Sequence, residues 1–129
     1  MMVGVDDDVA TTLRERWSAK IERVGAGSSW VDQSLEPVVT VAAADPDLRE
    51  LFPFTSMNRL CFSRCSAYPY TVDCPCISAD RGHYVVLSTW AVSDEPAPVL
   101  GETGDPTTAV AIVVAHLPAD RAIWIGSAG

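Results

Sequence analysis

The first part of the chain has the clearest repeat of apolar positions. These residues recur at steps of three and four, as on one face of a helix: Val9, Leu13, Trp17, Ile21 and Val24. Aspartates lie at the N-terminal end of this stretch and basic residues lie toward its C-terminal end, which complements the dipole of a helix. We therefore predict a helix from Asp6 to Val24, ended by Gly25-Ala-Gly27.

The next segments are less regular. Residues 25–33 predict a loop. Residues 35–44 fit two elements, because Pro37 is acceptable in a first helical turn, whereas Val38-Val39-Thr40-Val41 is typical of a strand. The three alanines that follow favour the helix. Asp45-Pro46 then predicts the capped start of a short helix ending at Leu51.

The second half is typical of a sheet. The predicted strands are Leu60–Cys65, Thr71–Ile77, Tyr84–Ala91, a short one from Val99, and Ala122–Ile125. Pro75 cannot donate to a ladder, so it marks its strand as broken or at an edge. The nearly continuous apolar run from Tyr84 indicates a strand buried on both faces.

A last helix is predicted from Asp105-Pro106 to about His116. It is apolar nearly all round, which indicates a helix packed centrally against the sheet. Together the elements predict a single α+β domain over residues 1–129. Its core would be an antiparallel β meander of about three to five strands, with helices packed on one side.

Charge, hydropathy and the lack of known motifs indicate which partners and cofactors to expect. The formal net charge of −8 disfavours nucleic acid and anionic membrane surfaces as partners. No apolar run is long enough for a membrane span, and Asp6-Asp7-Asp8 stands where a secretion signal would be basic. We expect a cytoplasmic monomer or homodimer. Since no nucleotide or metalloenzyme motif occurs, we expect neither a cofactor nor a metal.

All four cysteines lie in one short segment, at Cys61, Cys65, Cys74 and Cys76. Their C-x3-C and C-x-C spacing only partly matches structural zinc sites. Cys61 and Cys65 would also lie about 13 Å apart on a strand, at roughly 3.3 Å per residue. A hairpin turn before Thr71 would instead bring Cys61 beside the C-x-C pair. A disulfide, a three-thiol cluster and ordinary apolar packing all stay open.

Three residues are catalytic candidates. Cys65 is a potential nucleophile, His83 could approach it across the sheet as a base, and Asp73 could act as an acid or base if buried.

Aromatic and basic residues around them suggest a ligand site. An apolar pocket with local positive charge would suit an acidic ligand. The predicted binding residues are Phe54, Arg59, Phe62, Arg64, Tyr68 and Tyr70.

Part of the chain resembles a known family. The run ADPDLRELFPFTSMNRLCFSRCSAYPY, followed by GHYVV and TTAVAIVVAHLP, is similar to small actinobacterial proteins known only as natural product biosynthesis proteins. The resemblance covers about residues 42–118 and includes Phe62-Ser63-Arg64-Cys65. Cys61, Cys74 and Cys76 have no recognised place in the family pattern, which weakens a family-wide four-thiol metal site.

This resemblance implies a secondary-metabolite pathway. The expected function is an accessory protein that binds a biosynthetic enzyme, a carrier or a small apolar or acidic intermediate. The alternative is a small cofactor-independent enzyme, a cyclase or isomerase, acting in an apolar pocket. A third reading is an immunity or regulatory protein that sequesters a product.

Overall fold

The computed structural model describes residues 3–129, with side chains from residue 7 onward. In this part of the chain the helices are α1 (Val3–Ala26), α2 (Trp30–Ala44), the short 3-10 helix η1 (Leu48–Glu50) and α3 (Pro106–Ala115). The strands are β1 (Phe52–Ser56), β2 (Arg59–Ser63), β3 (Cys65–Ala67), β4 (Cys76–Asp80), β5 (His83–Leu87), β6 (Val99–Thr103) and β7 (Trp124–Ser127).

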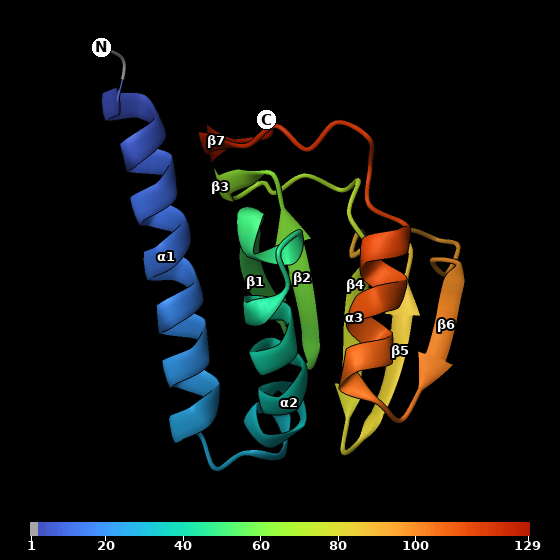
Figure 1. The fold of residues 1–129 in the computed structure, drawn as a ribbon. Coiled ribbons are helices and arrows are strands. Elements are labelled where there is room, and N and C mark those ends of the chain that lie inside the picture. Colours follow the sequence, from blue (N-terminus) through green and yellow to red (C-terminus); the bar gives the residue numbers. More distant parts are fainter. Residues whose placement is uncertain (1–2) are drawn as a thin grey trace.

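The strands form two sheets. The larger one is an antiparallel meander in the order β1-β2-β4-β5-β6. The smaller one consists of β3 and β7, which pair in parallel. Figure 1 shows α2 and α3 across one face of the larger sheet, with α1 beside α2. The predicted α+β fold is therefore confirmed. No helix within the described residues is both long and apolar enough to span a membrane.

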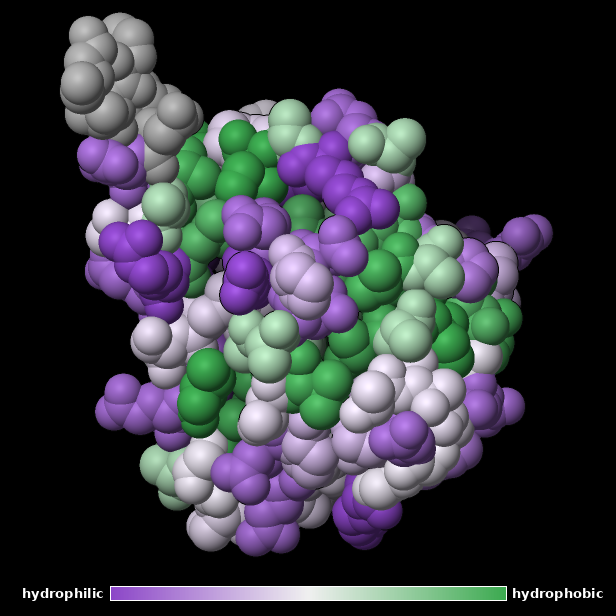
Figure 2. Space-filling view, in the orientation of Figure 1, coloured by the Kyte–Doolittle hydropathy of each residue, from purple (hydrophilic) through white to green (hydrophobic). Residues whose placement is uncertain are grey.

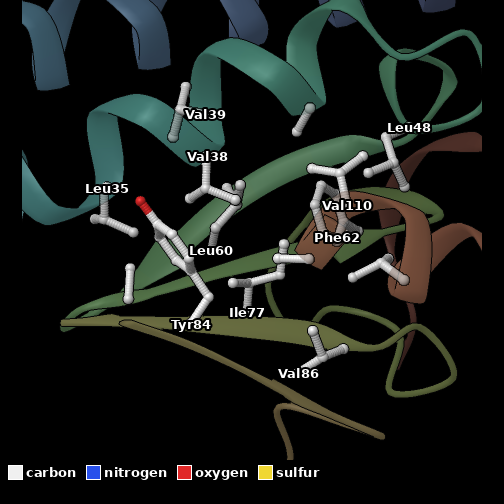
Figure 3. Close-up of a cluster of buried hydrophobic side chains, with 14 of the residues drawn as sticks. Leu35, Val38, Val39, Leu48, Leu60, Phe62, Ile77, Tyr84, Val86 and Val110 are labelled. Carbon is white, nitrogen blue, oxygen red and sulfur yellow. The ribbon is translucent and has the colours of Figure 1, made fainter. Parts of the chain in front are cut away.

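The core lies between this face and the helices (Figure 3). Alternation along the strands sends every second side chain toward the helices. The buried set includes Leu35, Val38 and Val39 of α2, Val110 of α3, and Leu60, Phe62, Ile77, Tyr84 and Val86 of the sheet. Burying one large apolar side chain stabilises the fold by about 1.5–3 kcal/mol, so this layer is a main source of stability.

The start of α2 corrects the predicted loop. The hydroxyl of Ser29 accepts a hydrogen bond from the Asp32 amide at 3.1 Å, which caps the helix and lets it begin at Trp30. Pro37 thus lies inside α2 and does not open it. The helical reading of residues 35–44 is confirmed, and the strand alternative is wrong.

Other boundaries also differ from the prediction: β1 was not expected, and β7 lies two residues later than the predicted strand. The Asp45 carboxylate accepts from the amides of Asp47 and Leu48, yet only the 3-10 turn η1 follows. The strand predicted from Leu60 divides at Arg64, where the chain passes from β2 into β3. Residues 71–75 form no strand, because β4 begins after Pro75.

The two most apolar elements are covered on one side only. On β5, Tyr84 and Val86 are buried, but Val85 and Leu87 are half-buried, and the strand ends at Leu87. On α3, Ala109, Val110 and Val113 are buried, whereas Ala111 is exposed. Small alanines tolerate exposure at little cost, so apolar composition here overstated burial.

Candidate functional site

A buried polar network holds the connection between β2 and β3. The Ser63 hydroxyl accepts from the amides of Cys65 at 3.1 Å and Thr71 at 3.2 Å. The Thr71 hydroxyl in turn accepts from the Arg64 amide at 3.0 Å. The Cys65 thiol lies 3.3 Å from the Ser63 hydroxyl and 3.6 Å from two backbone carbonyl oxygens. The polar groups around the Cys65 thiol therefore belong to the hydrogen bonds that hold this loop together.

Arg64 is bound on several sides. Its guanidinium lies 2.9 Å from the Asp73 carboxylate and 3.4 Å from that of Asp120. It also donates to the Ala122 carbonyl and lies over the Trp124 ring, 5.4 Å from the centroid. The hydrogen bond that Arg64 donates to the Asp73 carboxylate raises the pKa of Arg64. Arg64 thus ties the loop before β4 to the C-terminal segment.

The predicted catalytic side chains do not converge. Asp73 pairs with Arg64, and Cys65 lies within the Ser63 network. His83 stands at the β4–β5 turn, opposite Asp80, and pairs with Glu102 at 3.2 Å. That turn lies about 13 Å along β5 from Leu87, which shares a row with Cys76 and Cys61. Cys65 lies four residues beyond Cys61, at the other end of the sheet.

Half of the predicted binding residues do come together. Phe54 stacks on Tyr70 with ring centroids 4.0 Å apart, and Tyr68 meets Tyr70 edge-on at 6.0 Å. Trp90, which we did not predict, meets Phe54 edge-on at 5.4 Å and donates to the Thr71 carbonyl. These rings cover the sheet face away from the helices.

The other predicted binding residues lie elsewhere. Phe62 is fully buried in the helix-side core, where its ring lies 6.3 Å from that of Trp17. Arg59 is half-buried at the start of β2, on the same sheet face as Cys61.

All four thiols are free and buried. Cys74 belongs to the helix-side core, and burial raises its pKa to about 12.

The thiols do not gather as a metal site. From residue 7 onward, no three His, Cys, Asp or Glu side chains are grouped to hold a metal ion. Cys61 and Cys76 do lie directly opposite each other on β2 and β4. This agrees with the expectation that a hairpin brings Cys61 beside the C-x-C pair.

A different surface is hollowed. A groove of about 450 Å³ runs between α1, the end of α2 and η1. We call it the α1 groove, lined by Ala10, Leu13, Arg14, Trp17, Ser18, Ile21, Ala43, Arg49 and Glu50. A second hollow of about 490 Å³ shares three of these residues and continues to the segment 123–125. Figure 2 shows hydrophobic residues beside the upper part of α1, bordered by hydrophilic ones.

The floor of the α1 groove is fixed and its rim is charged. Trp17 is 6% exposed and donates from its indole nitrogen to the Leu51 carbonyl at 3.0 Å. Ile21 remains 44% exposed although it shares the apolar stripe of α1. Arg14 and Arg49 are exposed at the rim, and neither forms an ion pair with a side chain in the described range 7–129. Glu50 is the acid among the lining residues.

A family model matches residues 13–123 of the chain and describes a family of unknown function, DUF6193. The chain belongs to the DUF6193 family. No curated protein and no solved structure matches it significantly. The resemblance to uncharacterised proteins is confirmed in this coarser form, and its natural-product setting stays a prediction. The DUF6193 match includes both sides of the α1 groove, from Leu13 to Glu50.

Sequence reasoning missed the α1 groove because its residues are scattered over three separate segments. One signal was present. Ile21 lies four residues after Trp17 on the same helical stripe, and only the fold decides which of them is covered. The basic rim gave no signal, since Arg14 and Arg49 are far apart in sequence.

Proposed function

We propose that this DUF6193 protein is a non-catalytic accessory protein of a natural-product pathway. It binds a small carboxylic acid with an apolar body in the α1 groove. The observation that supports this most strongly is the combination of an apolar floor with two arginines that form no ion pair with any side chain of residues 7–129. Most small-molecule sites pair an apolar lining with a few polar groups that fix the orientation of the ligand.

The charge of the chain makes this rim unusual. The formal net charge is −8, so the surface as a whole repels carboxylates. Arg14 and Arg49 together outweigh the single Glu50 at the groove, and a guanidinium binds a carboxylate with two parallel hydrogen bonds. The floor at Leu13, Trp17 and Ile21 would cover the apolar body of the acid.

The size of the groove favours a small molecule. About 450 Å³ falls within the range of roughly 300–1,000 Å³ typical of small-molecule sites. A cyclase or isomerase has less support, because Cys65, Asp73 and His83 lie in three different surroundings. Their catalytic roles stay predictions.

A matched series of ten-carbon probes tests the proposal. Decanoate, decanol and decylamine share one apolar body and differ in charge. Trp17 in the floor makes tryptophan fluorescence a direct readout, and calorimetry gives the affinity. We expect decanoate to bind most tightly and decylamine not at all. Equal binding of all three probes would reduce the site to an unspecific apolar surface and contradict the role of the arginines.

A further inference from the structure

The pairing of Cys61 with Cys76 has a definite geometry. The Ala79 amide donates to the Asn58 carbonyl at 2.9 Å, so that opposed pair is a hydrogen-bonded one. Hydrogen-bonded and non-hydrogen-bonded pairs alternate along an antiparallel ladder. Cys61 and Cys76 lie three pairs beyond Asn58 and Ala79, so they form a non-hydrogen-bonded pair. Cα atoms in such pairs lie about 4.5 Å apart. Disulfides span Cα distances of roughly 4.4–6.8 Å, so the backbone already satisfies the bond.

The surroundings give the two thiols different roles. The hydrogen bond with Cys61 lowers the pKa of Cys76; burial opposes this shift, and the charge of Arg59 adds to it. The same hydrogen bond, together with burial, raises the pKa of Cys61. The thiol of the pair that loses its proton first is the nucleophile, since the thiolate is the reactive form, and these directions favour Cys76.

We propose that Cys61 and Cys76 form a reversible dithiol–disulfide site whose oxidant is a hydroperoxide. The Cys76 thiolate attacks one oxygen of hydrogen peroxide and the O–O bond breaks. That oxygen stays on the sulfur as a sulfenic acid, and the second oxygen leaves as hydroxide, which takes up the proton that Cys76 released. The Cys61 thiol then attacks the Cys76 sulfur; the S–S bond forms, the S–O bond breaks, and water leaves. Two thiols and one hydrogen peroxide thus give one disulfide and two waters. An external thiol reverses the step.

The buried position of Cys61 and Cys76 favours a small oxidant that can reach them through a local opening of the structure. Both thiols are fully buried, and the Cys76 sulfur lies 3.6 Å from the Thr89 carbonyl. Thr89 belongs to the irregular segment 88–98 between β5 and β6, in which Val92 is 91% exposed. Such a segment opens locally far more readily than a strand.

The other two cysteines are internal controls. The Cys65 thiol contacts hydroxyl and carbonyl oxygens around Ser63, and Cys74 faces the helix-side core. Neither is opposite another cysteine in the sheet pairing.

Peptide mapping of the oxidised protein tests the proposal. Trypsin cuts after Arg59, Arg64 and Arg81, so Cys61 falls in peptide 60–64 and the other three cysteines fall in peptide 65–81. Reduced protein is treated with hydrogen peroxide, alkylated and digested without reductant. We expect the two peptides to be joined through Cys76, and dithiothreitol to separate them. Joining through Cys65 or Cys74, or no joining while the protein stays folded, would overturn the proposal.

Variants give a second readout. Cys65→Ser and Cys74→Ser should retain the link, whereas Cys61→Ser and Cys76→Ser should lose it. Oxidation should raise the Tm of the wild-type protein by about 5–10 °C, because the bond closes a loop of moderate length. The Tm of Cys76→Ser should not rise. An equal rise in that variant would place the stabilising oxidation elsewhere.

Discussion

Two regions of the molecule combine arginines with aromatic rings, and they differ in what the arginines contact. Around β2 and β3, Arg64 is 17% exposed and lies between Asp73, Asp120 and the Trp124 ring. At the α1 groove, Arg14 and Arg49 are exposed and have no ion pair among the described side chains. The first region uses its positive charge to hold the fold together. The second leaves its charge unpaired among the described side chains, which is why we propose it as a ligand site.

The difference shows why composition alone misplaces a site. Residues 51–76 hold five aromatics and all four cysteines. In the folded protein the polar groups of this segment bind mainly to one another and to nearby backbone, in the Ser63 network and the Arg64 ion pairs. The α1 groove is unremarkable in sequence, and the packing of α1 against η1 creates it.

The largest expected effect separates a ring in the core from a half-buried ring on the other face of the sheet. Phe62→Ala should lower the free energy of unfolding by about 3–5 kcal/mol, because Phe62 is fully buried between sheet and helices. Phe54→Ala should cost less, since Phe54 is only half-buried. Urea denaturation measures both. A stable Phe62→Ala protein that loses decanoate binding would restore Phe62 to the ligand site.

Arg64→Ala tests the region that is closed by its own ion pairs. It should lower the free energy of unfolding by about 1–3 kcal/mol, because it removes the largely buried guanidinium that joins Asp73 and Asp120 and packs over the Trp124 ring. Decanoate affinity should not change. A loss of affinity with unchanged stability would show that Arg64 is a ligand residue.

Arg14→Ala and Arg49→Ala test the open region. Each should weaken decanoate binding about tenfold, which is the value of one charge-assisted contact near 1.4 kcal/mol. Stability should change by less than about 0.5 kcal/mol, as is usual for exposed positions. Arg23→Ala is the matched control, since Arg23 is exposed on the same helix but does not line the groove. Equal effects at Arg23 and Arg14 would reduce the binding to general charge attraction.

The smallest effect concerns a carboxylate outside both regions. The hydroxyl of Thr108, followed by the Thr107 amide, lowers the pKa of Asp105 at the start of α3. A lowered folded-state pKa adds stability above the unfolded value near 3.8, and this stability is lost as the pH falls through the folded value. Asparagine also caps helices, so Asp105→Asn should fold normally.

The pH dependence of Tm checks this sign. The Tm difference between wild type and Asp105→Asn should be largest near neutral pH and shrink below about pH 4. A difference that grows as the pH falls would contradict the assignment.

Local signals predicted much of the fold. The apolar stripe of α1, the cap at Asp105 and the turn at Asp80–Gly82 were visible because each depends on neighbouring residues. The start of α2 was predicted too late. Ser29 is a good capping residue, but a proline is usual in the first turn of a helix, so Pro37 indicated a later start. The position of Cys61 near the C-x-C pair followed from hairpin geometry.

The α1 groove could not be predicted in the same way. Arg14 and Arg49 meet only because α1 lies beside the end of α2 and η1, which no local pattern specifies. Whether a cation is free also depends on distant residues: Asp120 reaches Arg64 across 56 positions of sequence.

The most direct test is an amide NMR titration of uniformly labelled protein with decanoate. The account predicts shift changes concentrated at residues 10–21 and 43–50, the two sides of the α1 groove, and their loss in the Arg14→Ala/Arg49→Ala double variant. Changes centred on residues 54–70 would contradict it, and would return the binding site to the region around Arg64.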